Sequence, residues 1–225
     1  MPLQISGCTR LRVTLMDVAT TLSYLKPQFQ KLLRPMAGSL ARNGVTANEV
    51  TILAVTGSLV VSLVLSLGSQ CPALFALLPA WLIVRMGLST IDGLLAIEFG
   101  QKSRLGGVLN EGGDIVADLA LSVPFFVLAT PSSLYWLALI TALSVISELI
   151  GIVSPWFGAN HRRNDGPFGK SDRAIAFATI GALIAMYGGF PTWISILLPV
   201  FVMMHLLTIT NRLRFSFVSY RDCDK

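Results

Sequence analysis

Long runs of apolar residues, separated by short polar segments, fill most of the chain after residue 50. A run of about 20 apolar residues has the length of a helix that crosses a lipid bilayer. The pattern predicts six such helices, over 50–68, 73–97, 113–130, 134–156, 174–190 and 191–211. Gly188, Gly189 and Pro191 predict a tight turn between the last two. The predicted fold class is therefore an all-α, polytopic membrane protein.

Lys and Arg residues occur only in alternate connections between these predicted helices. The connections at 68–72, 130–133 and 188–193 carry no charged residue, whereas the segment before the first helix, the two other connections and the tail are basic. Of the 17 Lys and Arg residues, only Arg85 lies inside a predicted helix. Because basic connections stay in the cytoplasm, the sequence predicts a multi-pass membrane protein with both termini cytoplasmic.

The composition agrees with a membrane protein. The chain is 53% hydrophobic and 13% charged, with a mean hydropathy of +0.69, whereas soluble domains carry about 25% charged residues. The net charge of +5 gathers on the face that would meet anionic lipid. Nucleic-acid binding would need a solvated basic domain, which the sequence lacks. The three cysteines are scattered, and their spacing indicates neither a disulfide framework nor a zinc site.

The segment 17–47 has its own pattern. Apolar residues lie at helical intervals between basic ones, at Leu25, Phe29, Leu32 and Leu33. Such a pattern is typical of an amphipathic helix that lies at the membrane surface. The alternative is a cytoplasmic helix packed on the bundle.

The rest of the chain is predicted to consist of an N-terminal extension, a membrane domain and a C-terminal tail. Residues 1–16 are predicted to be an unstructured extension, or to precede a true start at Met16. The membrane domain then covers 48–215, and 216–225 form a cytoplasmic tail.

Two predicted helices carry polar residues in places where a charge is costly. In the second helix these residues lie at i, i+4 and i+7 and share one face: Arg85, Ser89 and Asp92. In the third they repeat every four residues: Asn110, Asp114 and Asp118. Both stripes lie at predicted cytoplasmic ends. Oxygen ligands that converge from two helices suit a hard cation such as Mg²⁺ or Mn²⁺, together with substrate phosphates.

Other interpretations of these charges exist. Arg85 alone would neutralise Asp92, with Asp114 and Asp118 solvated at a helix end. Glu148, inside the fourth predicted helix, would line the same cavity or pair with Arg85, and we favour the pairing. His205, in the last predicted helix, is expected to be a neutral core residue.

The motif as a whole resembles the signature of the CDP-alcohol phosphotransferase family, D-x-x-D-G-x-x-A-R-x8-G-x3-D-x3-D. The corresponding residues keep its spacing: Ser89, Asp92, Gly93, Ala96, Ile97, Gly106, Asn110 and Asp114. The segments 40–55 and 162–177 add to the resemblance, which covers about residues 22–215 and points to a divergent bacterial branch. It implies a six-helix membrane transferase that displaces CMP from a CDP-linked lipid with an acceptor alcohol, aided by two divalent metals, Mg²⁺ or Mn²⁺.

The resemblance also implies a role for each site residue. Asp92 and Asp114 would hold metal, with Ser89 and Asn110 as weaker oxygen donors and Asp118 as a replacement ligand. Asp114 would also be catalytic, accepting the proton of the acceptor hydroxyl.

The substrates would contact further residues. The cytidine nucleotide would lie beside Gly93, Ala96, Gly106, Asn48 and Thr51. Phosphate on the lipid or the acceptor would be bound by Arg163, Lys170 and Arg173, whose alternative role is to determine topology.

Ser89, Ile97 and Asn110 replace an Asp, an Arg and an Asp of the family motif. This replacement motivates the alternative that the chain is a catalytically impaired relative that binds a nucleotide or lipid headgroup, or scaffolds a partner. A small transporter is a third alternative. The resemblance implies CDP-diacylglycerol-like lipid, a polar alcohol and membrane lipids as partners, and a homodimer. It leaves the acceptor alcohol undefined.

Overall fold

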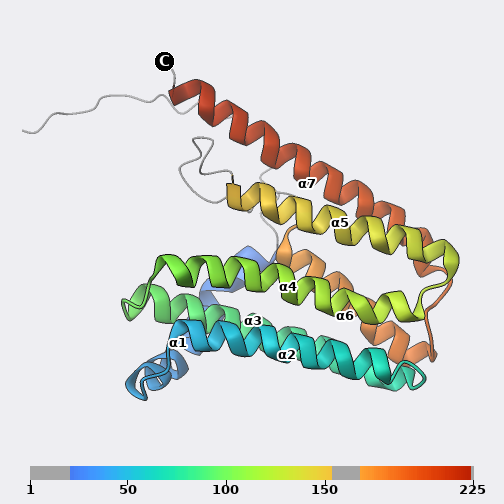
Figure 1. Ribbon diagram of the computed structural model, residues 1–225, viewed down its shortest axis with the longest axis horizontal. Coiled ribbons are helices and arrows are strands. Elements are labelled where there is room, and N and C mark those ends of the chain that lie inside the picture. The colour runs from blue at the N-terminus through green and yellow to red at the C-terminus, as the bar shows by residue number, and fades with distance from the viewer. Residues whose placement is uncertain (1–20, 154–167, 224–225) are drawn as a thin grey trace, which may run out of the picture.

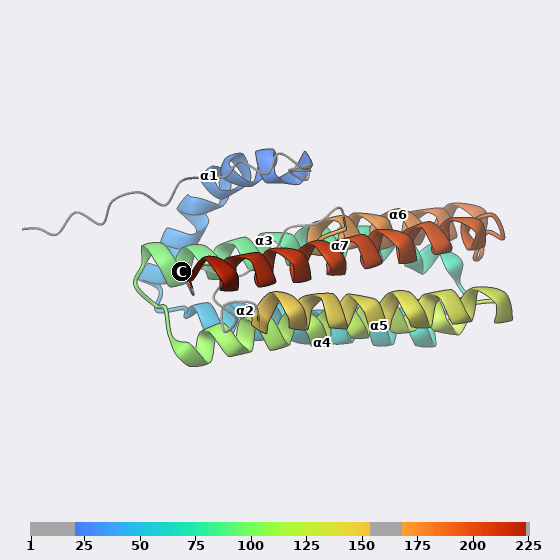
Figure 2. The same cartoon turned by 90° about the horizontal axis from the view of Figure 1, so that it is seen from above.

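The computed structural model describes residues 21–153 and 168–223, and within them every regular element is a helix. Their bounds are α1 (Thr21–Arg42), α2 (Ala47–Leu67), the short 3-10 helix η1 (Pro72–Ala76), α3 (Leu77–Glu98), α4 (Arg104–Leu128), α5 (Pro131–Val153), α6 (Lys170–Tyr187) and α7 (Ile194–Cys223). The helices α2 to α7 run side by side along the long axis (Figure 1). Figure 2 shows α2, α4 and α5 in one layer and α3, α6 and α7 in the other.

Among the described residues, four segments are long and apolar enough to cross a membrane: Ala47–Leu67, Pro72–Glu98, Pro131–Val153 and Ile194–Arg214. They correspond to the first, second, fourth and sixth predicted helices. The other two, α4 and α6, carry charged residues in their first turns and beyond, which lowers their hydropathy. The all-helical, membrane-type prediction is therefore confirmed.

Local sequence signals explain where several helices begin and end. A reciprocal cap starts α2, because the Thr46 hydroxyl accepts from the Glu49 backbone N–H and the Glu49 carboxylate accepts from the Thr46 N–H. The hydroxyl of Ser103 accepts from the Gly106 N–H at 2.9 Å and starts α4 nine residues before the predicted position of 113. The helix α6 ends at Tyr187, because the next residue, Gly188, adopts a φ of +77°, which suits glycine.

The main core lies between the two layers. It includes Phe75, Leu78, Phe125, Ile184 and Leu198, all fully buried. Many other large apolar side chains are exposed on the outside of the bundle, which is the expected surface of helices that contact lipid tails.

The helix α1 lies outside the bundle and packs on α3 (Figure 2). Ala37 of α1 is buried with Leu95 of α3, while Leu32 stays exposed. Glu98 accepts two hydrogen bonds from Arg34, at 2.9 and 2.7 Å, and holds the pKa of that guanidinium above its ordinary value. The predicted helix in 17–47 is present, and it packs on the bundle over at least this stretch.

Candidate active site

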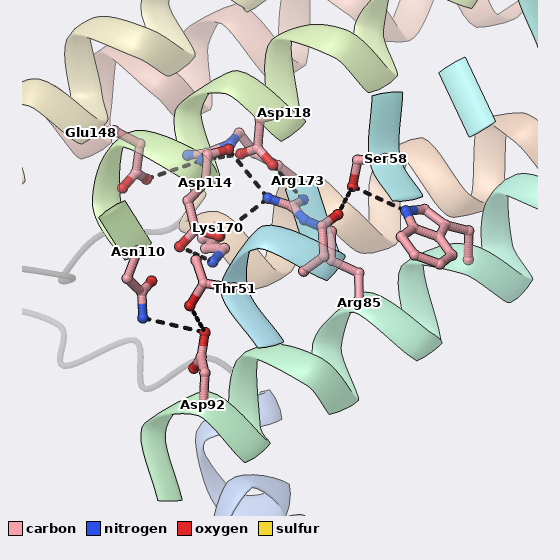
Figure 3. Close-up of polar contacts among 12 residues, drawn as sticks. Thr51, Ser58, Arg85, Asp92, Asn110, Asp114, Asp118, Glu148, Lys170 and Arg173 are labelled. Carbon is pink, nitrogen blue, oxygen red and sulfur yellow. Dashed lines mark hydrogen bonds and ion pairs between the residues drawn. The ribbon is translucent and has the colours of Figure 1, made fainter. Parts of the chain in front are cut away.

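The polar stripes of α3 and α4 meet, as their spacing predicted, next to the connection between the two helices (Figure 3). Asp92 of α3 is 4% exposed. Its Oδ2 atom accepts from the Thr51 hydroxyl at 3.0 Å and from the Asn110 amide at 3.5 Å. Three helices, α2, α3 and α4, therefore contribute one side chain each to this carboxylate.

The other oxygen of Asp92 has no such partner. Its Oδ1 atom is buried and makes no hydrogen bond with any of the residues that the structure describes. An unsatisfied buried carboxylate oxygen is unfavourable by about 1–3 kcal/mol. A bound cation would remove this cost, so the atom marks the place where a ligand is expected.

Asp114 lies one helical turn after Asn110 and is surrounded by basic groups. Lys170, the first residue of α6, donates to its Oδ2 atom. Arg85 of α3 lies 3.3 Å from its Oδ1 atom and 3.2 Å from its backbone oxygen. The carboxylate therefore receives a positive charge on each oxygen.

Asp118, one turn deeper, belongs to a buried ion network. Arg85 donates to its Oδ1 atom at 2.5 Å, and Arg173 donates to its Oδ2 atom at 3.0 Å. Arg173 also donates to Glu148 at 3.0 Å, and Arg212 of α7 lies 3.9 Å from the same Glu148 oxygen. Figure 3 shows the members of this network from α3 to α6, and Arg212 extends it to α7.

One predicted pairing is wrong, and one alternative interpretation is not supported. Glu148 pairs with Arg173 and Arg212 and not with Arg85. Arg85 neutralises Asp114 and Asp118 and not Asp92. The cause is the packing of α7 against α5 and of α6 against α3, which helix periodicity cannot reveal. The only sequence signal for Arg212 was that a buried acidic residue such as Glu148 needs basic partners.

The predicted nucleotide-site residues differ in their surroundings. A side chain at Gly93 would meet no atom within 4 Å, so the space beside Asp92 is open there. At Gly106 a Cβ atom would lie 2.7 Å from Asn48 Oδ1, so this glycine allows α4 to begin in contact with α2. Ala96 is partly buried against α1 and α2 residues.

The remaining predicted residues are less central. Ser89 is partly buried on α3, and no hydrogen bond of its side chain is found among the described residues. Arg163 lies outside the described residues. His205 is fully buried, with Nδ1 2.9 Å from the Phe201 oxygen, as expected for a core histidine.

The site offers a small set of oxygen donors for a divalent metal. Over residues 21–153 and 168–223, no three His, Cys, Asp or Glu side chains lie close enough together to form a metal site by themselves. A smaller set fits, because the unpartnered Oδ1 atom of Asp92 lies in a site with the neutral amide of Asn110, and Asp114 is one turn further along α4. Oxygen donors of this kind suit Mg²⁺ or Mn²⁺ with substrate phosphates completing the shell.

The fold matches that of a solved enzyme. Crystal structures of Mycobacterium tuberculosis phosphatidylinositol phosphate synthase (PgsA1) superpose with a TM-score of 0.68 for the form with CDP-DAG bound, at 20% identity over 83% of this chain and 94% of that chain. The form with manganese and citrate gives 0.67, at 21% identity over 81% and 88%.

No protein-family model matches the sequence. The chain shares the fold of these phosphatidylinositol phosphate synthases, and by sequence it belongs to the family of the Escherichia coli protein YnbA. Its sequence is 40% identical over 194 residues to the inner membrane protein YnbA of Escherichia coli (strain K12), covering 86% of this chain and 95% of that protein.

Proposed function

We propose that the protein is an integral-membrane transferase of phospholipid biosynthesis. It moves a substituted phosphate group from a CDP-linked lipid, such as CDP-diacylglycerol, to the hydroxyl of a polar acceptor, and CMP is released. The observation that carries the proposal is the junction of α3 and α4. There, Asp92 has a buried unpartnered oxygen, Asn110 lies against it, and Gly93 leaves open space beside it.

Each residue at this junction has a task. Asp92 and Asn110, with Ser89 as a further neutral donor, would hold a divalent metal, and Thr51 orients Asp92 through its hydroxyl. When bound, the metal would polarise the pyrophosphate of the CDP-lipid. Asp114 accepts the proton of the attacking hydroxyl.

The nucleotide and phosphate contacts follow from the same geometry. The cytidine nucleotide enters beside Gly93, with Ala96, Gly106 and Asn48 on neighbouring turns. Lys170, whose side chain is 34% exposed, is placed to contact phosphate. Arg173 is 2% exposed and has an Nη1 atom without a hydrogen-bond partner among the described residues, so a phosphate contact there requires entry into the bundle.

The protein is proposed to cross the inner membrane six times. The fold supports this because α4 and α6 lie alongside the four apolar helices (Figure 1) and complete the two layers. The basic connections place both termini in the cytoplasm, and α1 lies at the cytoplasmic surface. The name of the relative YnbA, an inner membrane protein, supports the same location.

A CMP-release assay tests the proposal. The purified protein in detergent would be incubated with CDP-diacylglycerol, Mn²⁺ or Mg²⁺ and a pool of polar alcohols. We expect metal-dependent CMP release that falls by about 100-fold or more in Asp114→Asn, because the proton acceptor is lost. Glu98→Gln is the matched control, since it removes a carboxylate from the same end of the protein but outside the stripes. Equal release by wild type and Asp114→Asn would contradict the proposed site.

A second function is favoured by one observation. Both oxygens of Asp114 are held by basic groups, and Ser89 and Asn110 replace acidic residues. A family member that binds CDP-lipid without turning it over would have these features. Saturable binding of CDP-diacylglycerol with no CMP release from any alcohol in the pool would establish this alternative.

A further inference from the structure

Lys170 occupies an unusual place for a lysine. It is the first residue of α6, where the helix dipole disfavours a positive charge. The start of this helix is fixed, because the Asp172 carboxylate accepts from the Gly169 N–H at 2.9 Å and the Phe168 N–H donates to the Thr208 hydroxyl of α7 at 3.1 Å. Because Lys170 is fixed at the positive end of the helix dipole, its ammonium group needs a negatively charged partner.

Asp114 is that partner. The Lys170 ammonium contacts its Oδ2 atom, and the contact joins α6 to the motif stripe of α4 (Figure 3). Arg85 covers the other oxygen at 3.3 Å. The carboxylate that ends the family motif therefore already has positive charge around it before any metal binds.

The three acidic residues of the site differ in charge compensation. Asp114 is paired with Lys170 and Arg85, and Asp118 with Arg85 and Arg173. The side chains that donate hydrogen bonds to Asp92 among the described residues are the neutral ones of Thr51 and Asn110, and its Oδ1 atom has no partner there. Asp92 is therefore the carboxylate whose negative charge remains to balance a bound cation.

We propose that the site holds a single divalent cation, at Asp92 and Asn110, and that the Lys170 ammonium supplies the second positive centre, at Asp114. The inference deepens the proposed function, on which it rests for the identity of the phosphate that both centres would face. A fixed ammonium carries one charge and three donors and can contact a phosphate oxygen as a metal ion does. An ammonium in this role explains why Ser89 and Asn110 are tolerated at positions where two bound metal ions would need carboxylates.

Counting bound Mn²⁺ tests this inference without any CDP-lipid. The full-length protein in detergent would be titrated with Mn²⁺, and free Mn²⁺ would be followed by electron paramagnetic resonance. We expect one ion per chain, which is lost in Asp92→Asn. In Lys170→Gln we expect binding to tighten by about tenfold or more, because a like charge near the ion is removed.

Two further variants serve as controls. Lys170→Arg keeps the charge and is expected to bind Mn²⁺ within about twofold of wild type. Lys102→Gln removes a charge from an exposed lysine of the α3–α4 connection, and we expect it to behave in the same way.

The inference would be overturned if the wild type bound two Mn²⁺ ions. It would also be overturned if Lys170→Gln bound Mn²⁺ with unchanged or weaker affinity than wild type. The outcome is separable from that of the transferase proposal: one Mn²⁺ at Asp92 without CMP release contradicts the proposed function alone.

Discussion

At the residue scale, the two oxygens of Asp92 are in different environments. Oδ2 receives two hydrogen bonds from neighbouring helices, and Oδ1 is buried without a partner among the described residues. Such an arrangement lowers stability, and proteins retain local conflicts of this kind mainly where function requires them. Asp92 is therefore the residue on which the proposed chemistry depends most directly.

Replacing Asp92 by Asn separates function from stability. The Asp92→Asn variant should lose CMP release by about 100-fold or more, because a neutral amide binds a divalent ion weakly. Its thermal unfolding in metal-free detergent should be unchanged or shifted upward, since an uncompensated buried charge is removed. Release within about tenfold of wild type would contradict the role of Asp92.

The sequence predicted the members of the site better than their partners. Four-residue spacing was enough to place Asn110, Asp114 and Asp118 on one face, because helix geometry is local. The pairing of Glu148 with Arg173 depends on how α5 packs relative to α6, and no local pattern contains that information. Lys170 was predicted as a phosphate ligand, and its contact with Asp114 had no sequence signal.

At the scale of elements, α2 and α4 approach closely at Gly113. A Cβ atom there would lie 2.8 Å from the Cγ2 atom of Val55, a branched side chain with little freedom to move. The contact fixes α4 against the helix that supplies Thr51. Correct placement of Asp92, Asn110 and Asp114 therefore depends on a small residue at this position.

Two adjacent glycines provide a matched comparison. Gly113→Ala should destabilise the protein by about 1–3 kcal/mol through overpacking, whereas Gly112→Ala, where a Cβ atom meets nothing within 4 Å, should not. Adding Val55→Ala to Gly113→Ala should recover part of the loss. Denaturation in detergent measures all three, and equal stability of the two single variants would contradict the proposed packing.

The ion network is a second link between elements. Arg173 of α6 joins Asp118 of α4 to Glu148 of α5, with all three side chains largely buried. Arg173→Met should destabilise the protein by about 3–5 kcal/mol, because it leaves buried carboxylates with fewer partners. Combined with Glu148→Gln, the loss should be smaller than the sum of the single losses by about 1 kcal/mol or more. Strictly additive losses in a double-mutant cycle would argue against a direct pair.

Element boundaries were predicted less well than the presence of the elements. The start of α4 was placed at 113 because the preceding turns are polar and glycine-rich, whereas the Ser103 cap begins the helix at Arg104. A hydropathy pattern shows how long the apolar part of a helix is, and not how long the helix itself is. Polar turns at the start of a helix are therefore missed when the helix is predicted from hydropathy. The missed turns carry Gly106 and Asn110, which belong to the site.

At the scale of the whole molecule, the candidate site lies at the end of the bundle where α3 leads into α4, and the basic connections lie at the same end in the predicted topology. A cytoplasmic site is expected for an enzyme whose product is CMP. The Lys and Arg distribution made this prediction possible from the sequence, because topology depends on charges in short connections and not on packing.

Cysteine labelling tests this topology. Cys71 is exposed in the connection between α2 and η1, which is predicted to be periplasmic. With Cys8 and Cys223 changed to Ser, a membrane-impermeant maleimide should label Cys71 in intact cells. In the same background, with Cys71 also changed to Ser, Lys102→Cys should be labelled only after permeabilisation. Labelling of Lys102→Cys in intact cells, with Cys71 labelled only after permeabilisation, would show the opposite orientation in the membrane. It would contradict a cytoplasmic site.

The most direct test of the transferase function is the coupling of CMP release to lipid formation. Purified protein would be given CDP-diacylglycerol with a labelled phosphatidyl group, Mn²⁺ and the pool of polar alcohols, and CMP and lipid products would be quantified in the same reaction. We predict one new phosphodiester-linked lipid for each CMP released. CMP accompanied only by phosphatidic acid would show that water is the acceptor, and no CMP at all would exclude transfer from this donor; either result would contradict the proposed function.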